Sequence, residues 1–255
     1  SDYKIILIFI GVLTMYFSII SNMYDPKNLD LLNQMASLKL SPELLQAMGF
    51  TLKSPSLVGF LSSYFYGLLM LAFPMIYYII IANKLIASQV DKGSMACILS
   101  TPNTRKKVVA TQALFLLSTI TLLVLFVTGL GIIVCSINFP DLLDVKAFIL
   151  LNLGVLLLHF AISSISFFSS CLFNETKNSL LFGAGVPILF LLIQMLSNVG
   201  NSLENLKYFT IFTLFNPTDI INGNNILLPF ISLIAIALAF YSAAVYVFDK
   251  KDLPI

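Results

Sequence analysis

The stretch NKLIASQVDKGSMACILSTPNTRKKVV (residues 83–109) decides how the rest of the chain is interpreted. Long apolar runs lie on both sides of it, which makes it a loop between two membrane spans. Its cations outnumber its acids five to one, and Lys and Arg collect on the cytoplasmic side of a bilayer. We therefore expect this loop inside the cell. The cations are Lys84, Lys92, Arg105, Lys106 and Lys107, and the acid is Asp91.

The interior of this loop has a helical pattern. Apolar residues precede and follow Asp91-Lys92-Gly93-Ser94, which predicts two short amphipathic helical turns separated at the glycine. Pro102 closes the pattern. Thr104 is placed to cap the next helix, whose first residues are basic.

The composition predicts an integral membrane protein. Apolar residues make up 58% of the 255 residues and charged residues 10%, with a mean hydropathy of +0.96. A soluble domain carries about a quarter charged residues. We expect an all-α membrane protein that forms one domain, 1–255. Six apolar runs are long enough to cross a bilayer: 3–24, 58–82, 108–135, 145–171, 180–197 and 226–248.

The distribution of charge predicts the topology. With the loop 83–107 inside, the inner segments hold nine Lys and Arg residues and the outer segments five. Both termini are then inside, and 25–57 and 199–225 are outside. The chain begins at Ser1 without an initiator methionine, which leaves open a further N-terminal segment.

The two long outer segments have helical patterns of their own. Segment 25–57 predicts two short amphipathic helices on the outer face, with Ser41-Pro42-Glu43 as a helix start and Gly49 as a stop. The apolar run 208–215 is too short to span a membrane, so we expect a re-entrant or interfacial helix there.

Two prolines predict irregular spans. Pro74 removes a backbone donor and should kink the second span near Met70, and Pro187 frees the carbonyl of Gly183 in the fifth. Small residues four apart let another helix approach closely. Such stripes are Gly59, Ser63 and Gly67 in the second span and Ala235, Ala239 and Ala243 in the sixth.

The fourth span carries a polar stripe, which consists of Asn152, His159, Ser163, Ser166 and Ser170. At 100° per residue these positions fall within about 60° of one another. Because polar groups are costly in lipid, the stripe should face other helices or water. Hydrogen bonding between helices and lining of a conduit both remain open. All five residues are substrate-path candidates, and within the stripe we favour packing for Ser163 to Ser170 and a cavity position for His159.

No enzyme site is visible. One histidine cannot build a His-based metal site, and Cys97, Cys135 and Cys171 lack metal-ligand spacing. No predicted span contains Asp or Glu, so nothing indicates an ion-coupled carrier. No Gly-rich phosphate loop followed by Lys-Ser or Lys-Thr occurs, so we expect no metal, no cofactor and no ATP hydrolysis in this chain. Energy would then come from another subunit that docks on the loop 83–107.

The loop resembles the first cytoplasmic loop of ABC type-2 export permeases. The resemblance lies in Ala87 to Ser94, in Ile98-Leu99-Ser100-Thr101-Pro102, and in Thr104-Arg105-Lys106-Lys107. Members often carry Glu where this chain has Gln89 and Met95, and they usually have an amphipathic inner helix before the first span. The outer insertion 25–57 is similar to permeases that export phenol-soluble modulins or serve bacteriocin immunity.

The resemblance implies an ATPase-coupling role for part of the loop and its boundary. The implied residues are Ser88, Asp91, Lys92, Gly93, Ser94, Met95, Leu99 and Arg105. We expect 87–99 to dock on the ATPase through its apolar face, with Asp91 and the Lys92 to Ser94 break at the contact.

The resemblance also implies partners and a cargo. Two permease copies, identical or paralogous, would pair in a bacterial plasma membrane with two ATP-binding-cassette ATPase subunits, which hold ATP and Mg²⁺. The 22 Phe and 10 Tyr suit export of an amphipathic peptide or another hydrophobic cargo. The alternative is a non-transporting membrane sensor or scaffold that holds a cytosolic partner through the 83–107 loop.

Overall fold

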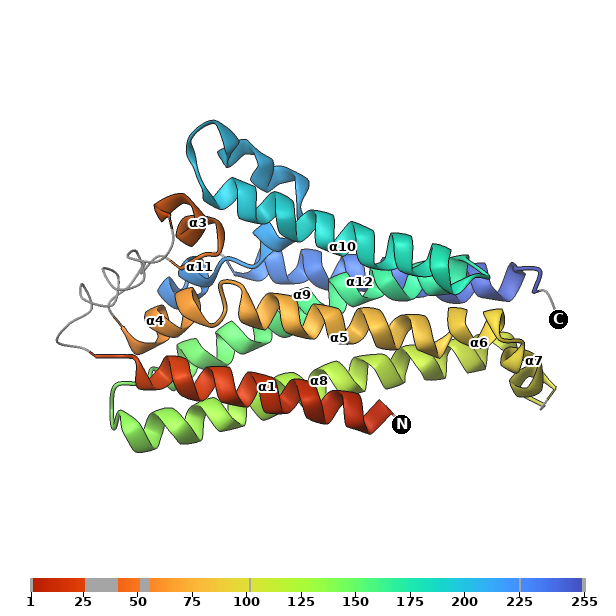
Figure 1. Cartoon of the computed structure of the whole chain (residues 1–255), viewed down its shortest axis with the longest axis horizontal. Helices are drawn as coiled ribbons and strands as arrows, with labels where there is room; N and C mark the ends of the chain where they lie inside the picture. The colour runs from red at the N-terminus through yellow and green to blue at the C-terminus, as the bar shows by residue number, and fades with distance from the viewer. Residues whose placement is uncertain (1, 26–40, 51–55, 101, 225, 254–255) are drawn as a thin grey trace.

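The computed structural model describes residues 2–25, 41–50, 56–100, 102–224 and 226–253, and all regular structure in these ranges is helical. Long helices run along one common axis (Figure 1). Six helical segments are long and apolar enough to cross a membrane, which confirms the predicted all-α fold with six spans. The long helices are α1 (Asp2–Asn22), α5 (Leu69–Leu85), α8 (Arg105–Asn138), α9 (Val145–Leu172), α10 (Thr176–Asn198) and α12 (Leu227–Lys250).

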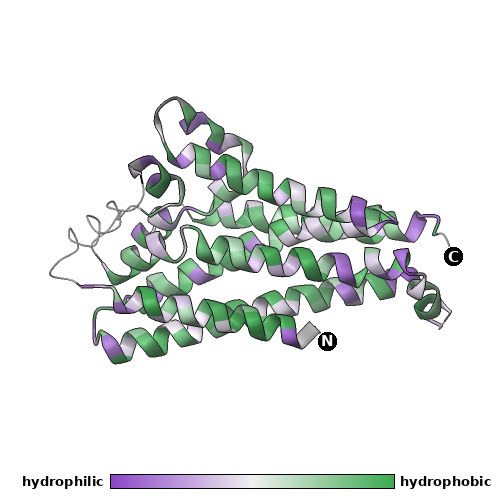
Figure 2. Cartoon of the chain, viewed as in Figure 1, coloured by the Kyte–Doolittle hydropathy of each residue, from purple (hydrophilic) through white to green (hydrophobic). Residues whose placement is uncertain are grey.

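Short helices lie at both ends of the bundle, where Figure 2 shows most of the polar residues. We call the end that carries α6 (Ala87–Asp91) and α7 (Ser94–Leu99) the loop end, and the opposite end the far end (Figure 1). The other short elements are α3 (Pro42–Ala47), α4 (Leu57–Tyr64), η1 (Asn201–Phe209), η2 (Ile211–Leu214) and α11 (Pro217–Asn222).

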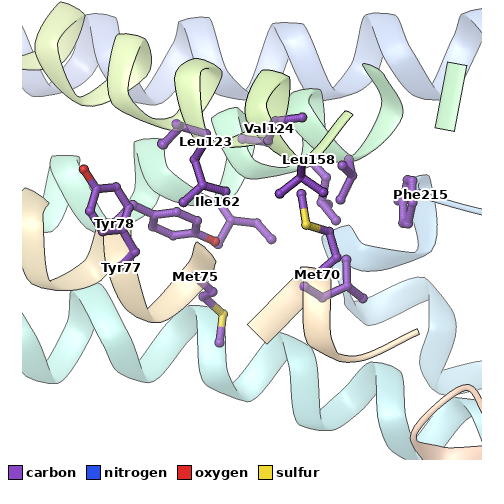
Figure 3. Packing of buried hydrophobic residues seen from close by; sticks show 14 of the residues in the cluster. Met70, Met75, Tyr77, Tyr78, Leu123, Val124, Leu158, Ile162 and Phe215 are labelled. Atoms are coloured by element: carbon purple, nitrogen blue, oxygen red, sulfur yellow. The ribbon is translucent and has the colours of Figure 1, made fainter. Parts of the chain in front are cut away.

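Helix α9 is the centre of the bundle. It packs against α12, α10, α5 and α8. Of the most apolar stretch of α9, 67% of residues are buried, against 17% for α1, α10 and α12. Figure 3 shows the core beside it, where Met70, Tyr78, Leu158 and Ile162 pack together. The side chains of α9 are therefore placed to contact most other spans.

The second predicted span, 58–82, is not one helix. It divides into α4 and α5, which are separated by residues 65–68. The kink near Met70 that Pro74 predicts stays a prediction. The separating segment lies against the backbone that follows α3. A Cβ atom on Gly67 would lie 2.9 Å from the Met48 carbonyl oxygen, so only glycine permits this approach. Pro74 lies inside α5, beyond the break.

Several local signals are confirmed. Ser41 Oγ accepts a hydrogen bond from Leu44 N at 3.3 Å and caps α3, and Thr104 Oγ1 accepts one from Lys107 N at 3.3 Å and caps α8. Gly93 separates α6 from α7 with a φ of 72°, and Gly49 ends the α3 turn with a φ of 77°.

At 34 residues, α8 is about 50 Å long and exceeds the bilayer core of about 30 Å.

The far end differs in part from the predictions. The first of the two helices expected in 25–57 would precede Ser41 and falls outside the described residues. The run 208–215 forms no single helix, because it belongs to η1 and η2, with Thr210 extended between them. Ala235 and Ala239 of the sixth span are exposed, so they do not pack within this chain.

Candidate functional site

All five residues of the polar stripe of α9 are buried. Their polar atoms reach neighbouring elements rather than the outer surface. His159, Ser166 and Ser170 bond backbone groups that the neighbouring helices do not use themselves, whereas the other two residues bond side chains.

His159 bonds a backbone oxygen released by a proline. Because Pro74 has no N–H, the carbonyl of Met70 loses the donor of an ordinary helix. His159 Nε2 lies 2.9 Å from this oxygen. A carbonyl only accepts, so Nε2 carries the proton and donates. His159 is 0% exposed and stabilises the proline site in α5.

Ser166 plays the same part for α10. Pro187 leaves the Gly183 carbonyl without its helical donor, as the sequence predicted, and Ser166 Oγ donates to this oxygen at 2.6 Å. The two helices approach closely there, since a Cβ atom on Gly183 would lie 3.3 Å from the Ser166 carbonyl oxygen. One face of α9 thus bonds both proline-freed carbonyls.

Ser170 joins the two sides of the break between α5 and α6. Its Oγ donates to the carbonyl oxygen of Ala82 at 2.8 Å and accepts from the N–H of Ala87 at 2.9 Å. At Ile86, between the helices, φ is −125° and ψ is −70°. The start of the loop is therefore attached directly to the central helix.

The remaining stripe residues bond side chains. Asn152 Oδ1 accepts from the Tyr66 hydroxyl at 2.8 Å, and Ser163 Oγ lies 2.9 Å from the Tyr241 hydroxyl of α12. The five residues thus connect α9 to other helices and to the segment between α4 and α5. A role in lining a cargo path stays a prediction.

The loop keeps its apolar face inside the chain. Ala87, Val90 and Met95 are buried, Met95 to 2% exposure, and Leu99 packs against the core while Ser88 is half-buried. The surface that we expected to dock on an ATPase is therefore covered by the chain itself. Among the predicted coupling residues, Asp91, Lys92 and Gly93 are exposed and form one turn, and the docking role of this turn stays a prediction.

Two acceptors in the loop hold neighbouring elements. Asp91 Oδ2 accepts a hydrogen bond from Thr176 N at 3.2 Å, which caps the start of α10. The side chain of Ser94 bonds that of Gln89 and also donates to the Gln89 carbonyl oxygen at 3.2 Å, which closes the turn around Gly93. The loop is thus bonded to both α9 and α10.

The chain end joins three helix ends beside the loop. Arg105 donates to the Lys251 carbonyl oxygen at 2.7 Å, and Lys106 pairs with Asp249 at 3.4 Å. Lys251 Nζ donates to the Cys171 carbonyl oxygen at 3.0 Å near the end of α9. Burial lowers the pKa of Lys251 to about 8. Arg105 therefore belongs to this junction as well as to the loop boundary.

Two of the cavities lined by described residues lie at opposite ends of the bundle. The larger, of about 440 Å³, is at the far end between α4, α10 and the η1–η2 segment, and polar residues such as Ser63, Gln194 and Asn216 line part of it. The second, of about 300 Å³, is at the loop end beside α8. No stripe residue lines either cavity, and no group of three metal-ligating side chains was found among the described residues.

Four contacts had no visible signal in the sequence. Tyr66 and Tyr241 look like ordinary aromatic residues of apolar runs, and nothing pairs them with positions 86 and 78 residues away. In the sequence, Lys251 is only one of several charged residues near the end of the chain, and nothing links it to the carbonyl oxygen of Cys171. The sequence likewise contains no signal that Asp91 caps the start of α10, which lies 85 residues further along the chain.

The comparisons with known proteins identify the family. The family model described as ABC-2 family transporter protein matches residues 4–253, which include nearly all of the six long helices. Comparison with curated proteins and with solved structures gave no match. The chain therefore belongs to the ABC-2 transporter family and is a multi-pass transmembrane component of an ABC transporter.

Proposed function

We propose that this chain is the permease subunit of an ATP-driven exporter. Two copies, identical or paralogous, assemble with two separate ATPase subunits, which hold ATP and Mg²⁺. Family membership supports the ATPase partner in general terms. Exposed apolar faces on α1, α10 and α12 suit contact with lipid and with a second permease.

The observation that carries the proposal is the pair of bonds between the loop and the spans. Ala87 N bonds Ser170 of α9, and Asp91 bonds the first residue of α10. An ATPase that presses on the exposed Asp91-Lys92-Gly93 turn would displace the ends of two spans together. ATP binding would then bias the bundle between inward-facing and outward-facing states.

We propose that the loop end faces the cytoplasm of a bacterium. Both ends of the described chain lie toward the loop end in Figure 1, as the predicted topology requires. The excess of Lys and Arg in the inner segments supports the cytoplasmic assignment. The far-end cavity would then open to the outside of the cell, where the cargo is released.

The proposed cargo is an amphipathic peptide or another hydrophobic molecule. The support is the aromatic content of the chain, with 22 Phe and 10 Tyr, and the resemblance of the insertion 25–57 to permeases of peptide-export systems. Aromatic side chains provide a large apolar area with little rotational freedom to lose on binding.

The test is ATP turnover of the reconstituted complex. Lys92→Glu reverses an exposed charge in the turn, and Lys250→Glu makes the same change at the loop end outside the turn. We expect Lys92→Glu to weaken ATPase binding about fivefold, which corresponds to about 1 kcal/mol, and to lower turnover stimulated by an amphipathic peptide. Lys250→Glu should behave as the wild type.

Two results count against the proposal. Equal ATPase binding by wild type and Lys92→Glu would remove the docking role of the turn. An ATPase that binds normally but never responds to cargo would favour the sensor or scaffold.

A further inference from the structure

The loop-end cavity has the chemistry of a lipid site. It lies between α8 and the segment that runs from the end of α5 through α7, and its volume is about 300 Å³. One ammonium and two carboxamides line it together with three apolar side chains. The lining residues are Lys84, Leu85, Gln89, Ile98, Gln112 and Phe115, none of which is acidic.

The cavity is where the outer apolar surface of the bundle meets the polar loop. On α5, Ile76 and Ile80 are exposed, and Lys84 follows four residues later on the same face. On α8, Leu122 and Phe115 are exposed one below the other, seven residues apart. A molecule in the cavity would thus have apolar side chains on its membrane side and a lysine on its aqueous side.

We propose that this cavity binds an anionic phospholipid of the leaflet at the loop end. The headgroup phosphate lies against Lys84, with Gln112 as a hydrogen-bond donor, and an acyl chain lies along Phe115. A zwitterionic lipid is a poorer fit, because its own cation competes for the phosphate while no lining carboxylate binds that cation. The assignment to the cytoplasmic leaflet rests on the proposed orientation.

The bound lipid would touch the loop. Gln89 belongs to α6 and bonds Ser94, and Ile98 belongs to α7, so both helices of the loop line the cavity. An anionic lipid would therefore hold the loop against α8. The composition of the leaflet would affect how firmly the loop is held.

The chain has no Trp, so one introduced indole reports on one place. Phe115→Trp puts this reporter at the cavity. The protein is reconstituted in vesicles that contain a small fraction of brominated phosphatidylglycerol or of brominated phosphatidylcholine, and bromine quenches the indole on contact. Both leaflets have the same composition, so the result does not depend on orientation or on transport.

We expect phosphatidylglycerol to be preferred over phosphatidylcholine about fivefold, since one Lys near anionic lipid contributes about 1 kcal/mol. Lys84→Gln should abolish the preference and Lys84→Arg should keep it. The matched control is Lys92→Gln, which removes an exposed lysine of the same loop that does not line the cavity and should leave the preference unchanged.

Three results would overturn the site. These are equal quenching by both lipids, a preference that survives Lys84→Gln, and a preference that disappears when inorganic phosphate is added, which would indicate a site for free phosphate. Native mass spectrometry of the unsubstituted protein checks that the indole did not create the site. It should detect bound phosphatidylglycerol that Lys84→Gln loses, and absence of this lipid would count against the proposal.

Discussion

At the scale of single residues, two buried tyrosines of one region differ in a way that can be measured. The Tyr66 hydroxyl donates to Asn152 at 2.8 Å, whereas the Tyr78 hydroxyl has no hydrogen-bond partner among the described residues. A buried hydroxyl without a partner loses its hydration and gains nothing in return. The same Tyr→Phe change should therefore have opposite consequences at the two positions.

We expect Tyr66→Phe to lower the free energy of unfolding by about 1–3 kcal/mol, because it leaves the side-chain oxygen Oδ1 of Asn152 unbonded. Tyr78→Phe should leave stability unchanged or raise it. Thermal unfolding in lipid nanodiscs measures both, and each variant is the control for the other. A loss at Tyr78 equal to that at Tyr66 would show that the Tyr78 hydroxyl has a partner.

His159 and Pro74 form a second pair with a sharp test. His159→Leu removes the donor to the Met70 carbonyl oxygen and should cost about 1–3 kcal/mol. Pro74→Ala restores a backbone N–H four residues after Met70. In the double variant this N–H replaces the histidine, so the loss should be largely recovered.

The unfolding free energies of the two single variants and the double variant test this coupling. Additive losses would mean that His159 does not act through the oxygen that Pro74 frees. Transport by the double variant answers a separate question. If its stability recovers and its cargo-stimulated turnover does not, the predicted path role of His159 gains support.

At the scale of elements, the start of α10 depends on a side chain of the loop. Asp91→Ala removes the cap from Thr176 N, and a lost cap costs about 1 kcal/mol. We expect faster hydrogen exchange in the first turn of α10, while Asp91→Asn, which keeps a side-chain oxygen, should change it less. Hydrogen exchange with mass spectrometry measures this turn directly.

The matched control lies at the other end of the bundle. Asp144 caps α9 through Ala147 N at 3.0 Å, so Asp144→Ala should raise exchange at the start of α9 and leave α10 unaffected. Unchanged exchange at the start of α10 in Asp91→Ala would contradict a structural link between the loop and this span.

At the scale of the whole molecule, the orientation can be tested with a native thiol. Cys97 is exposed in the loop, while Cys135 and Cys171 are buried. If the loop end is cytoplasmic, an impermeant maleimide should not label Cys97 in intact cells and should label it after permeabilisation. In a Cys97→Ser background, Glu43→Cys places an exposed thiol in α3 and should be labelled from outside. Labelling of Cys97 in intact cells would invert the proposed topology.

The sequence by itself determined that the chain is all-α with six segments long and apolar enough to span a membrane, and it located several helix caps and breaks. Those features depend on local hydropathy, on caps such as Thr104 and on Gly93, which act over a few residues. It also determined that the stripe of α9 is polar and that Pro187 frees the Gly183 carbonyl. These conclusions need only the chemistry of neighbouring positions.

Only the tertiary structure decided what the polar groups bond and where the second span breaks. The donor to the Met70 carbonyl oxygen comes from a position 89 residues away. The backbone that lies against Gly67 belongs to Met48 and Gly49, which precede α4 in the chain. In a membrane interior a freed backbone group must find a partner within the protein. The sequence shows that this need exists, but which side chain meets it depends on the packing of helices that are distant along the chain.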